Sequence, residues 1–203
     1  MQLEKILPLL TLRDIEDSKI IGELLVKNGF SFVEVTYRTA IATKVIKELS
    51  KIDGLTIGAG TVSNEKQMKD ALDNGAKFII TPGINNTLIR KCLDINVPIY
   101  PGVITPSEIE LCKAYGLKTL KLFPCGIFGG VNLIKSYRGP YQDIKFIPTG
   151  GINLNNAKEF LILDNVESIG GSFILKDEFI NNKDWDNLDK HLKLIRNNLK
   201  EFI

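Results

Sequence analysis

The sequence FVEVTYR at residues 32–38 is followed by AIATKVIKELSK at residues 40–51, and this pair of segments indicates the fold. The first segment is rich in β-branched and aromatic residues and has the length of a strand. The second carries apolar residues at helical spacing, which predicts an amphipathic helix. A strand followed at once by a helix is the unit from which parallel α/β folds are built.

The same unit recurs along the chain. Eight strand-length apolar runs are expected, at residues 6–12, 32–38, 55–61, 77–83, 98–104, 119–124, 145–151 and 166–172. Eight such units in 203 residues predict a single domain over residues 1–203, folded as a closed parallel (β/α)8 TIM barrel. An open doubly wound sheet is the alternative, but it usually has glycines after its first strand, where this chain has Arg13-Asp14-Ile15-Glu16.

Composition excludes several kinds of partner. A net charge of +2 provides no basic surface for nucleic acid, and no apolar run is long enough to span a membrane. Cys92, Cys112 and Cys125 lack close metal-ligand spacing, so we expect buried thiols and a reducing cytoplasm. His191 is the only histidine and we expect it at the surface, which argues against histidine-dependent triads and zinc sites.

The strand expected at residues 32–38 carries the first catalytic candidate. Side chains alternate between the two faces of a strand, so Glu34, Thr36 and Arg38 share the face that points into a barrel. A buried carboxylate or guanidinium is costly unless it is paired or functional. A structural Glu34–Arg38 ion pair is the alternative. We favour function, because no other carboxylate lies so deep in a strand near its carboxyl end.

The second candidate is Lys121, which lies within the apolar segment TLKLFP at residues 119–124. Alternation places Lys121 on the inward face with Thr119 and Phe123. Burial disfavours the charged form of a lysine, and a neutral amine is the nucleophile that Schiff-base chemistry requires. A buried Lys121–Glu34 salt bridge is the structural alternative, and the two interpretations are compatible.

Two glycine pairs follow the last two expected strands, in PTGGIN at residues 148–153 and IGGS at residues 169–172. Barrel enzymes often bind phosphate at the loops after strands seven and eight, where glycine exposes backbone N–H groups. Thr149 and Ser172 add hydroxyl groups to these turns. Tight helix–strand packing is the alternative explanation for the glycines.

These residues are similar to motifs of the 2-keto-3-deoxy-6-phosphogluconate (KDPG) and 4-hydroxy-2-oxoglutarate (KHG) aldolase family over nearly the whole chain. The matching segments, in order, are EVTYRT (34–39), GAGTV (58–62), TPG (81–83), PGVIT (101–105), KLFP (121–124), GGV (129–131), PTGGI (148–152) and GGS (170–172). Many short matches in the right order are more specific than any one of them.

The resemblance implies an activity and roles for residues. The implied reaction is cleavage of 2-dehydro-3-deoxy-6-phosphogluconate to pyruvate and glyceraldehyde 3-phosphate through a Schiff base on Lys121, with Glu34 moving protons. Arg38 and Thr61 would hold the keto-acid carboxylate. The implied pocket and phosphate residues are Pro82, Phe123, Thr149, Gly150, Gly151, Gly171 and Ser172. The family also implies a homotrimer that needs no metal or cofactor.

Two departures from the family pattern concern the rim of the site. Many members carry arginine near the end of the first strand, where this chain has Thr11, with Arg13 two residues on. Many have Ala-Glu after Phe-Pro, where this chain has Cys125-Gly126.

Three further functions stay open. They are a KHG aldolase that releases pyruvate and glyoxylate, a phosphosugar isomerase or epimerase with Glu34 as the base, and a non-catalytic metabolite-binding barrel.

Overall fold

A computed structural model of the chain describes residue 1 and residues 3–202. Each of the eight expected runs contains a strand, and all strand pairs are parallel. The strands are β1 (Ile6–Leu10), β2 (Phe32–Thr36), β3 (Thr56–Gly60), β4 (Phe78–Ile80), β5 (Ile99–Tyr100), β6 (Gly102–Val103), β7 (Thr119–Leu122), β8 (Lys145–Pro148) and β9 (Ile169–Gly171).

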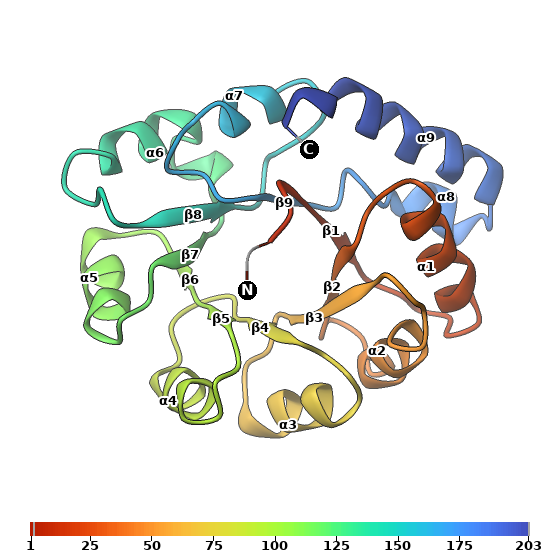
Figure 1. The fold of residues 1–203 in the computed structure, drawn as a ribbon, viewed down its shortest axis with the longest axis horizontal. Helices are drawn as coiled ribbons and strands as arrows, with labels where there is room; N and C mark the ends of the chain where they lie inside the picture. The colour runs from red at the N-terminus through yellow and green to blue at the C-terminus, as the bar shows by residue number, and fades with distance from the viewer. Residues whose placement is uncertain (2, 203) are drawn as a thin grey trace.

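Helices follow most of the strands and lie around them (Figure 1). They are α1 (Asp17–Lys27), α2 (Ala42–Leu49), α3 (Glu65–Asp73), α4 (Asn86–Asp94), α5 (Pro106–Ala114), α6 (Val131–Tyr137), α7 (Ala157–Leu161), α8 (Asp177–Asn181) and α9 (Trp185–Asn198), with the 3-10 helices η1 (Gly126–Phe128) and η2 (Lys200–Phe202). The strands therefore form an inner layer and the helices an outer one.

The prediction of a closed (β/α)8 barrel is wrong. The described strands form a six-stranded parallel sheet, ordered β5-β4-β3-β2-β1-β9, and a separate three-stranded sheet, ordered β6-β7-β8. Between β8 and β9 there are only isolated bridges, Phe146 to Val166 and Thr149 to Gly170. The hydrogen-bonded ladder is therefore not continuous around the strands.

Proline explains both interruptions. Pro101 separates β5, which pairs with β4, from β6, which pairs with β7, so the fifth apolar run is split between the two sheets. Pro148 ends β8 beside the second interruption. Proline has no N–H group to donate to a ladder, so a strand that contains it cannot bond regularly to its neighbour.

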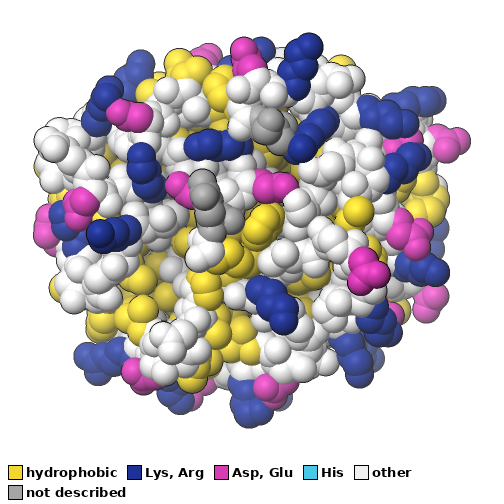
Figure 2. All heavy atoms as spheres, viewed as in Figure 1, with side chains coloured by type: hydrophobic (Ala, Val, Ile, Leu, Met, Phe, Trp, Pro, Cys, Tyr) yellow, Lys and Arg dark blue, Asp and Glu magenta, His cyan; other side chains and the backbone are white. Residues whose placement is uncertain are grey.

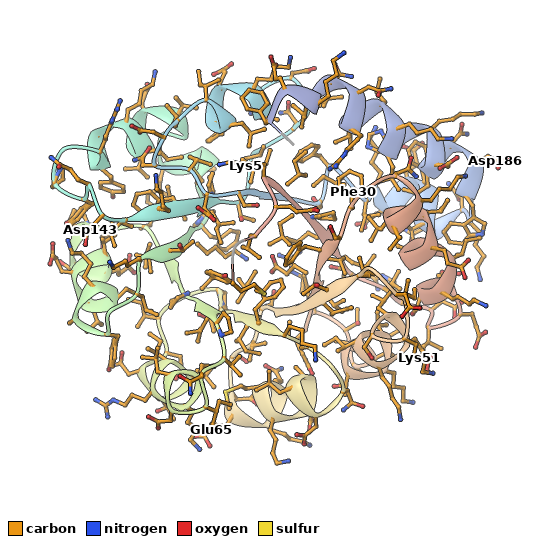
Figure 3. The ribbon with its side chains drawn as sticks, viewed as in Figure 1. Lys5, Phe30, Lys51, Glu65, Asp143 and Asp186 are labelled. Atoms are coloured by element: carbon orange, nitrogen blue, oxygen red, sulfur yellow. The ribbon has the colours of Figure 1, made fainter. Side chains whose placement is uncertain are left out.

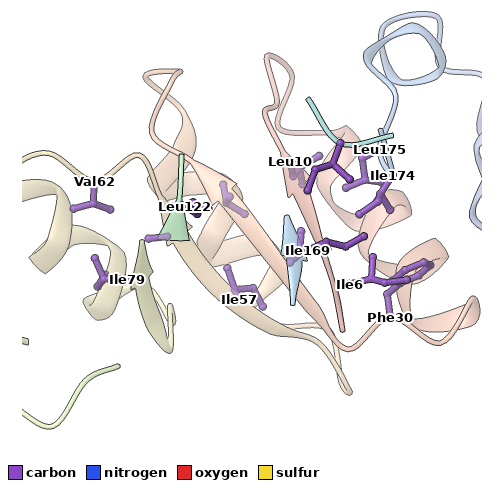
Figure 4. Close-up of a cluster of buried hydrophobic side chains, with 14 of the residues drawn as sticks. Ile6, Leu10, Phe30, Ile57, Val62, Ile79, Leu122, Ile169, Ile174 and Leu175 are labelled. Atoms are coloured by element: carbon purple, nitrogen blue, oxygen red, sulfur yellow. The ribbon is translucent and has the colours of Figure 1, made fainter. Parts of the chain in front are cut away.

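The alternation of side chains divides the core into two clusters. Ile79 packs in the larger cluster, between the strands and the helices, while its neighbours Phe78 and Ile80 belong to a smaller cluster on the other face of the strands. Part of the larger cluster is drawn in Figure 4, where Ile6 and Leu10 of β1 lie near Ile174 and Leu175. The smaller cluster consists of Leu3, Leu7, Phe78, Ile80, Tyr100 and Ile147.

The outer surface is charged and mixed. On the face shown in Figure 2, basic and acidic side chains are interspersed around the rim. Figure 3 shows Lys51, Glu65, Asp143 and Asp186 at the periphery of the molecule, whereas Phe30 lies between strands and helices. No helix within residues 3–202 is long and apolar enough to cross a membrane.

Candidate active site

Glu34 of β2 and Lys121 of β7 meet inside the ring of strands. The Nζ atom of Lys121 lies 3.4 Å from Oε1 of Glu34, and only 4% and 1% of the two side chains are exposed. Both residues alternate with members of the outer core cluster, Val33 and Val35 on β2 and Leu120 and Leu122 on β7, so both side chains face inward. Both inward positions were predicted from alternation, and the structure brings the two groups together.

Lys121 and Glu34 are buried, but the contact between them is long for a charged hydrogen bond. The separation of 3.4 Å is longer than the roughly 2.7–2.9 Å of a strong charge-assisted hydrogen bond. Nζ of Lys121 also lies 5.3 Å from the centre of the Phe123 ring, which is within the range of cation–π contacts. Phe123 follows β7 directly and precedes a cis peptide bond to Pro124. Lys121 is therefore held among a carboxylate, an aromatic ring and apolar strands.

A second polar contact lies beside Glu34, and the sequence analysis did not foresee it. The hydroxyl oxygens of Thr11 and Thr36 are 2.7 Å apart, and Thr36 is buried. Thr36 was expected on the face of Glu34, and the pairing of Leu9 with Glu34 in the β1–β2 ladder brings Thr11 alongside it. Strand register, which the sequence does not state, would have been needed to find this contact.

Arg38 departs from the expected position. β2 ends at Thr36, and Arg38 lies in the following turn with its side chain exposed, so the prediction that it shares the buried face of Glu34 is wrong. It makes no ion pair with any residue that the structure describes, so the expected Glu34–Arg38 pair is not formed. Its guanidinium is available to an anionic ligand at the carboxyl ends of the strands.

Two further candidates lie in the loops after β3 and β4. Thr61, which follows Gly60, has φ of 57°, a left-handed conformation that is uncommon for a β-branched residue. Strained backbone of this kind is concentrated at functional sites. Pro82 is exposed in the turn after β4, next to Thr81, whose hydroxyl donates to the Gly83 carbonyl at 2.6 Å. Both residues lie at the carboxyl edge of the six-stranded sheet.

The glycine turns after β8 and β9 also come together. Thr149 forms the parallel bridge to Gly170, where a methyl group would lie 2.6 Å from the Thr149 hydroxyl oxygen. Gly150 and Gly151 have φ of 89° and 81°, which other residues rarely adopt. Gly171 is buried at the end of β9, and the next residue, Ser172, is exposed in the following turn.

An adjoining loop packs against the Gly150–Gly151 turn. The backbone N–H groups of Cys125 and Gly126 donate to the carbonyls of Thr149 and Gly150, each at 2.9 Å. An open cavity of about 450 Å³ lies on this loop and includes Gly126 and Gly151 in its lining. A larger one, of about 570 Å³, lies at the amino end of β8 beside Lys135, Arg138 and Lys145, away from every predicted site residue. Its position argues against a part in chemistry at Lys121.

Among the described residues, neither the cysteines nor the histidine is hydrogen-bonded to Lys121 or Glu34. The three cysteines are free and buried, as predicted, and burial raises the pKa of the Cys125 thiol to about 12. His191 is half-buried rather than at the surface, and its Nε2 lies 2.8 Å from the Phe173 carbonyl oxygen. Within residues 3–202, no group of three or more His, Cys, Asp or Glu side chains is arranged to hold a metal ion.

Comparison with known protein families identifies the family of the chain. The family described as KDPG and KHG aldolase matches residues 1–191. The chain belongs to this aldolase family. The buried lysine and glutamate thus lie on two of the segments, EVTYRT and KLFP, that carried the resemblance.

Individual members of the aldolase family agree with this assignment. A 2-dehydro-3-deoxy-phosphogluconate aldolase of Haemophilus influenzae is 36% identical over 92% of this chain and 88% of its own length. A KHG/KDPG aldolase of Escherichia coli K12 is 34% identical over 91% of this chain and 87% of its own. The chain therefore spans most of the length of these relatives.

A solved structure of the aldolase family adds a covalent state. The KDPG aldolase of Legionella pneumophila, with pyruvate captured as a covalent carbinolamine intermediate, has a TM-score of 0.91 at 34% identity. It covers 95% of this chain, which in turn covers 94% of it. A carbinolamine is the species formed when an amine adds to a ketone, which is the first step of Schiff-base chemistry.

Proposed function

We propose that this chain is a Schiff-base aldolase that cleaves 2-dehydro-3-deoxy-6-phosphogluconate to pyruvate and glyceraldehyde 3-phosphate. The single observation that carries the proposal is the buried contact of 3.4 Å between Lys121 Nζ and Glu34 Oε1. An amine sheltered from water and a carboxylate within reach of it supply a nucleophile and a group that moves protons. The aldolases that the chain resembles support the choice of substrate.

The mechanism begins at Lys121. Its neutral amine attacks the C2 ketone to form a carbinolamine, and Glu34 carries the protons as water leaves to give an iminium. The C4 hydroxyl then loses its proton, the C3–C4 bond breaks, and its electron pair moves into the iminium to form an enamine. The aldehyde leaves. Protonation of the enamine at C3 and hydrolysis of the resulting iminium release pyruvate and free Lys121.

The remaining residues are proposed to bind the two anionic ends of the substrate. Arg38 and Thr61, which follow β2 and β3, would hold the carboxylate, while Pro82 and Phe123 line the ketone end. The residues proposed for the distal phosphate are Thr149, Gly150, Gly151, Gly171 and Ser172. The positive φ angles of Gly150 and Gly151 support this, because such turns present backbone N–H groups to an anion.

KHG is the second candidate substrate, since one relative is named for both activities. The glycine turns favour the phosphorylated compound, because KHG has a second carboxylate in place of a phosphate-bearing tail. Comparing kcat/KM for the two substrates would rank them. We also propose, from the resemblance, that the chain acts in the cytoplasm and that it is a homotrimer. Analytical sedimentation would test the trimeric state.

The decisive experiment is incubation with pyruvate and sodium borohydride followed by mass spectrometry of peptides. We expect one reduced adduct on the peptide that contains Lys121 and none in Lys121→Ala. Lys118 is the matched control, because it lies three residues earlier in the chain and is exposed. Lys118→Ala should keep the adduct. A folded protein without any adduct would instead support an isomerase or a binding module.

A further inference from the structure

Strand β3 contributes glycine to the interior where its neighbours contribute side chains. Gly58 and Gly60 alternate with Ile57 and Ala59, which pack in the outer core cluster, so the glycines face inward. A methyl group on Gly58 would lie 2.0 Å from a ring carbon of Phe78. One on Gly60 would lie 2.0 Å from a carboxylate oxygen of Glu34. Neither position has room for a side chain.

The atoms nearest to an added methyl group at Gly60 all belong to Glu34. The three nearest atoms to an added methyl group are Oε1, Cγ and Cδ of Glu34, at 2.0, 2.5 and 2.6 Å. In the β2–β3 ladder, Glu34 pairs with Gly58 and Thr36 pairs with Gly60. The Glu34 side chain therefore leans across the ladder and toward the carboxyl end, over Gly60, and in this position its carboxylate meets Lys121.

Backbone conformation does not explain the glycine. Gly60 is not among the residues with positive φ, whereas Thr61 beside it is. Alanine could adopt the backbone of residue 60, so the nearest obstacle to a side chain there is the side chain of Glu34.

We propose that Gly60 is a positioning residue for proton transfer, whose missing side chain lets Glu34 reach Lys121. This inference rests on the proposed function. With alanine at this position the Glu34 carboxylate must move away from β3 by an ångström or more, because carbon and oxygen cannot approach to 2.0 Å. A displacement of about 1 Å in a catalytic group can cost about 10²-fold in rate.

The test compares two matched glycine variants. Gly60→Ala and Gly58→Ala lie on the same strand and face and introduce the same 2.0 Å overlap, but the nearest atoms belong to Glu34 in the first and to the Phe78 ring in the second. For Gly60→Ala we expect kcat to fall about 10²-fold with KM little changed, and exchange of the pyruvate methyl protons with deuterium to slow in parallel. Gly58→Ala, measured per folded protein, should keep most of both activities. Gly139→Ala, which meets no atom within 4 Å, controls for the substitution itself.

A background without the Glu34 side chain beyond Cβ identifies Glu34 as the group affected. Alanine lacks Oε1, Cγ and Cδ, so Glu34→Ala removes all three close contacts. Adding Gly60→Ala to Glu34→Ala should then cost little further activity, although Glu34→Ala lowers activity by itself. This comparison holds even if Gly60→Ala alone does not fold. Equal losses from Gly60→Ala in both backgrounds would overturn the inference, as would equal kinetics of Gly58→Ala and Gly60→Ala.

Failure of the inference is distinguishable from failure of the proposed function. If the wild-type protein forms no borohydride adduct on Lys121, the aldolase proposal itself is wrong. If the wild type forms the adduct and turns over while Gly60→Ala matches it, only the role of Gly60 is wrong.

Discussion

Lys121 Nζ lies 3.4 Å from Oε1 of Glu34, although the two residues are 87 positions apart in the chain. Only 4% and 1% of their side chains are exposed, so both groups are almost completely withdrawn from solvent. Each is therefore the main electrostatic partner of the other, and a change to either should affect both stability and chemistry.

Breaking this pair on one side should destabilise the fold. Lys121→Met leaves the Glu34 carboxylate buried without its partner, which we expect to lower the free energy of unfolding by about 3–5 kcal/mol in urea denaturation. Adding Glu34→Gln should recover much of this loss. For comparison, Lys158→Ala breaks an exposed pair with Glu201, at 2.7 Å, and should cost less than about 1 kcal/mol. Equal stability of Lys121→Met and the double variant would contradict the expectation.

Removing the charge of Glu34 should slow proton transfer without removing the nucleophile. Glu34→Gln keeps the shape of the side chain but cannot accept a proton, so we expect kcat to fall about 10²–10⁴-fold. Steady-state kinetics with the phosphorylated substrate measure this loss. When Glu34→Gln is incubated for a long time with saturating pyruvate and sodium borohydride, Lys121 should still be labelled. A kcat close to that of the wild type would assign proton transfer to another group.

Arg38 should affect binding more than chemistry. Its exposed guanidinium follows β2, and loss of a hydrogen bond to a charged group costs about 1.5–3 kcal/mol, so Arg38→Leu should raise KM about 10–100-fold. Steady-state kinetics with both candidate substrates measure this effect. Arg138→Leu is the control, since Arg138 pairs with Asp164 near the amino end of β8. An unchanged KM in Arg38→Leu would place the carboxylate elsewhere.

The single histidine should make stability sensitive to mild acid. Burial lowers the pKa of His191 from its ordinary 6.5, outweighing the bond to the Phe173 carbonyl. The unfolded chain then binds this proton more readily than the folded protein. Stability from His191 is complete above about pH 6.5 and is lost as pH falls from there toward the lower folded pKa. Thermal melts should show the wild type losing more Tm between pH 7 and 5 than His191→Gln. Parallel curves would exclude this role.

Cys125, four residues after Lys121, should be inert in the native protein. Burial raises the pKa of the Cys125 thiol to about 12, and those of Cys92 and Cys112 to about 11. Since the thiolate is the reactive species, very little of it exists at pH 8. Iodoacetamide should therefore modify none of the three at that pH until urea unfolds the chain. Rapid labelling of Cys125 alone would indicate that the loop after β7 opens.

Periodicity was enough to find the elements and the inward direction of the two central residues. Each expected apolar run contains a strand, and alternation placed Glu34 and Lys121 on buried inner faces because a strand has a period of two. It failed for Arg38, because alternation holds only within a strand and β2 ends two residues earlier. The strand boundary depends on where the ladder stops, which is a property of the neighbouring strands.

Closure of the sheet was not predictable in the same way. Counting eight apolar runs led to a closed barrel, whereas the described ladders stop at Pro101 and beyond Pro148. Both prolines are visible in the sequence. Their effect depends on whether the missing N–H faces a neighbouring strand, and that depends on register.

The sequence by itself determined the order of strands and helices, the segments that match the aldolase family and the residue types available for chemistry, because these follow from local pattern and identity. Only the tertiary structure decided which residues meet. The partnership of Lys121 with Glu34, the hydroxyl contact of Thr11 with Thr36 and the space above Gly60 all join residues on different strands. Such contacts depend on parallel register, which is set by the packing of all the strands together and not by any one of them.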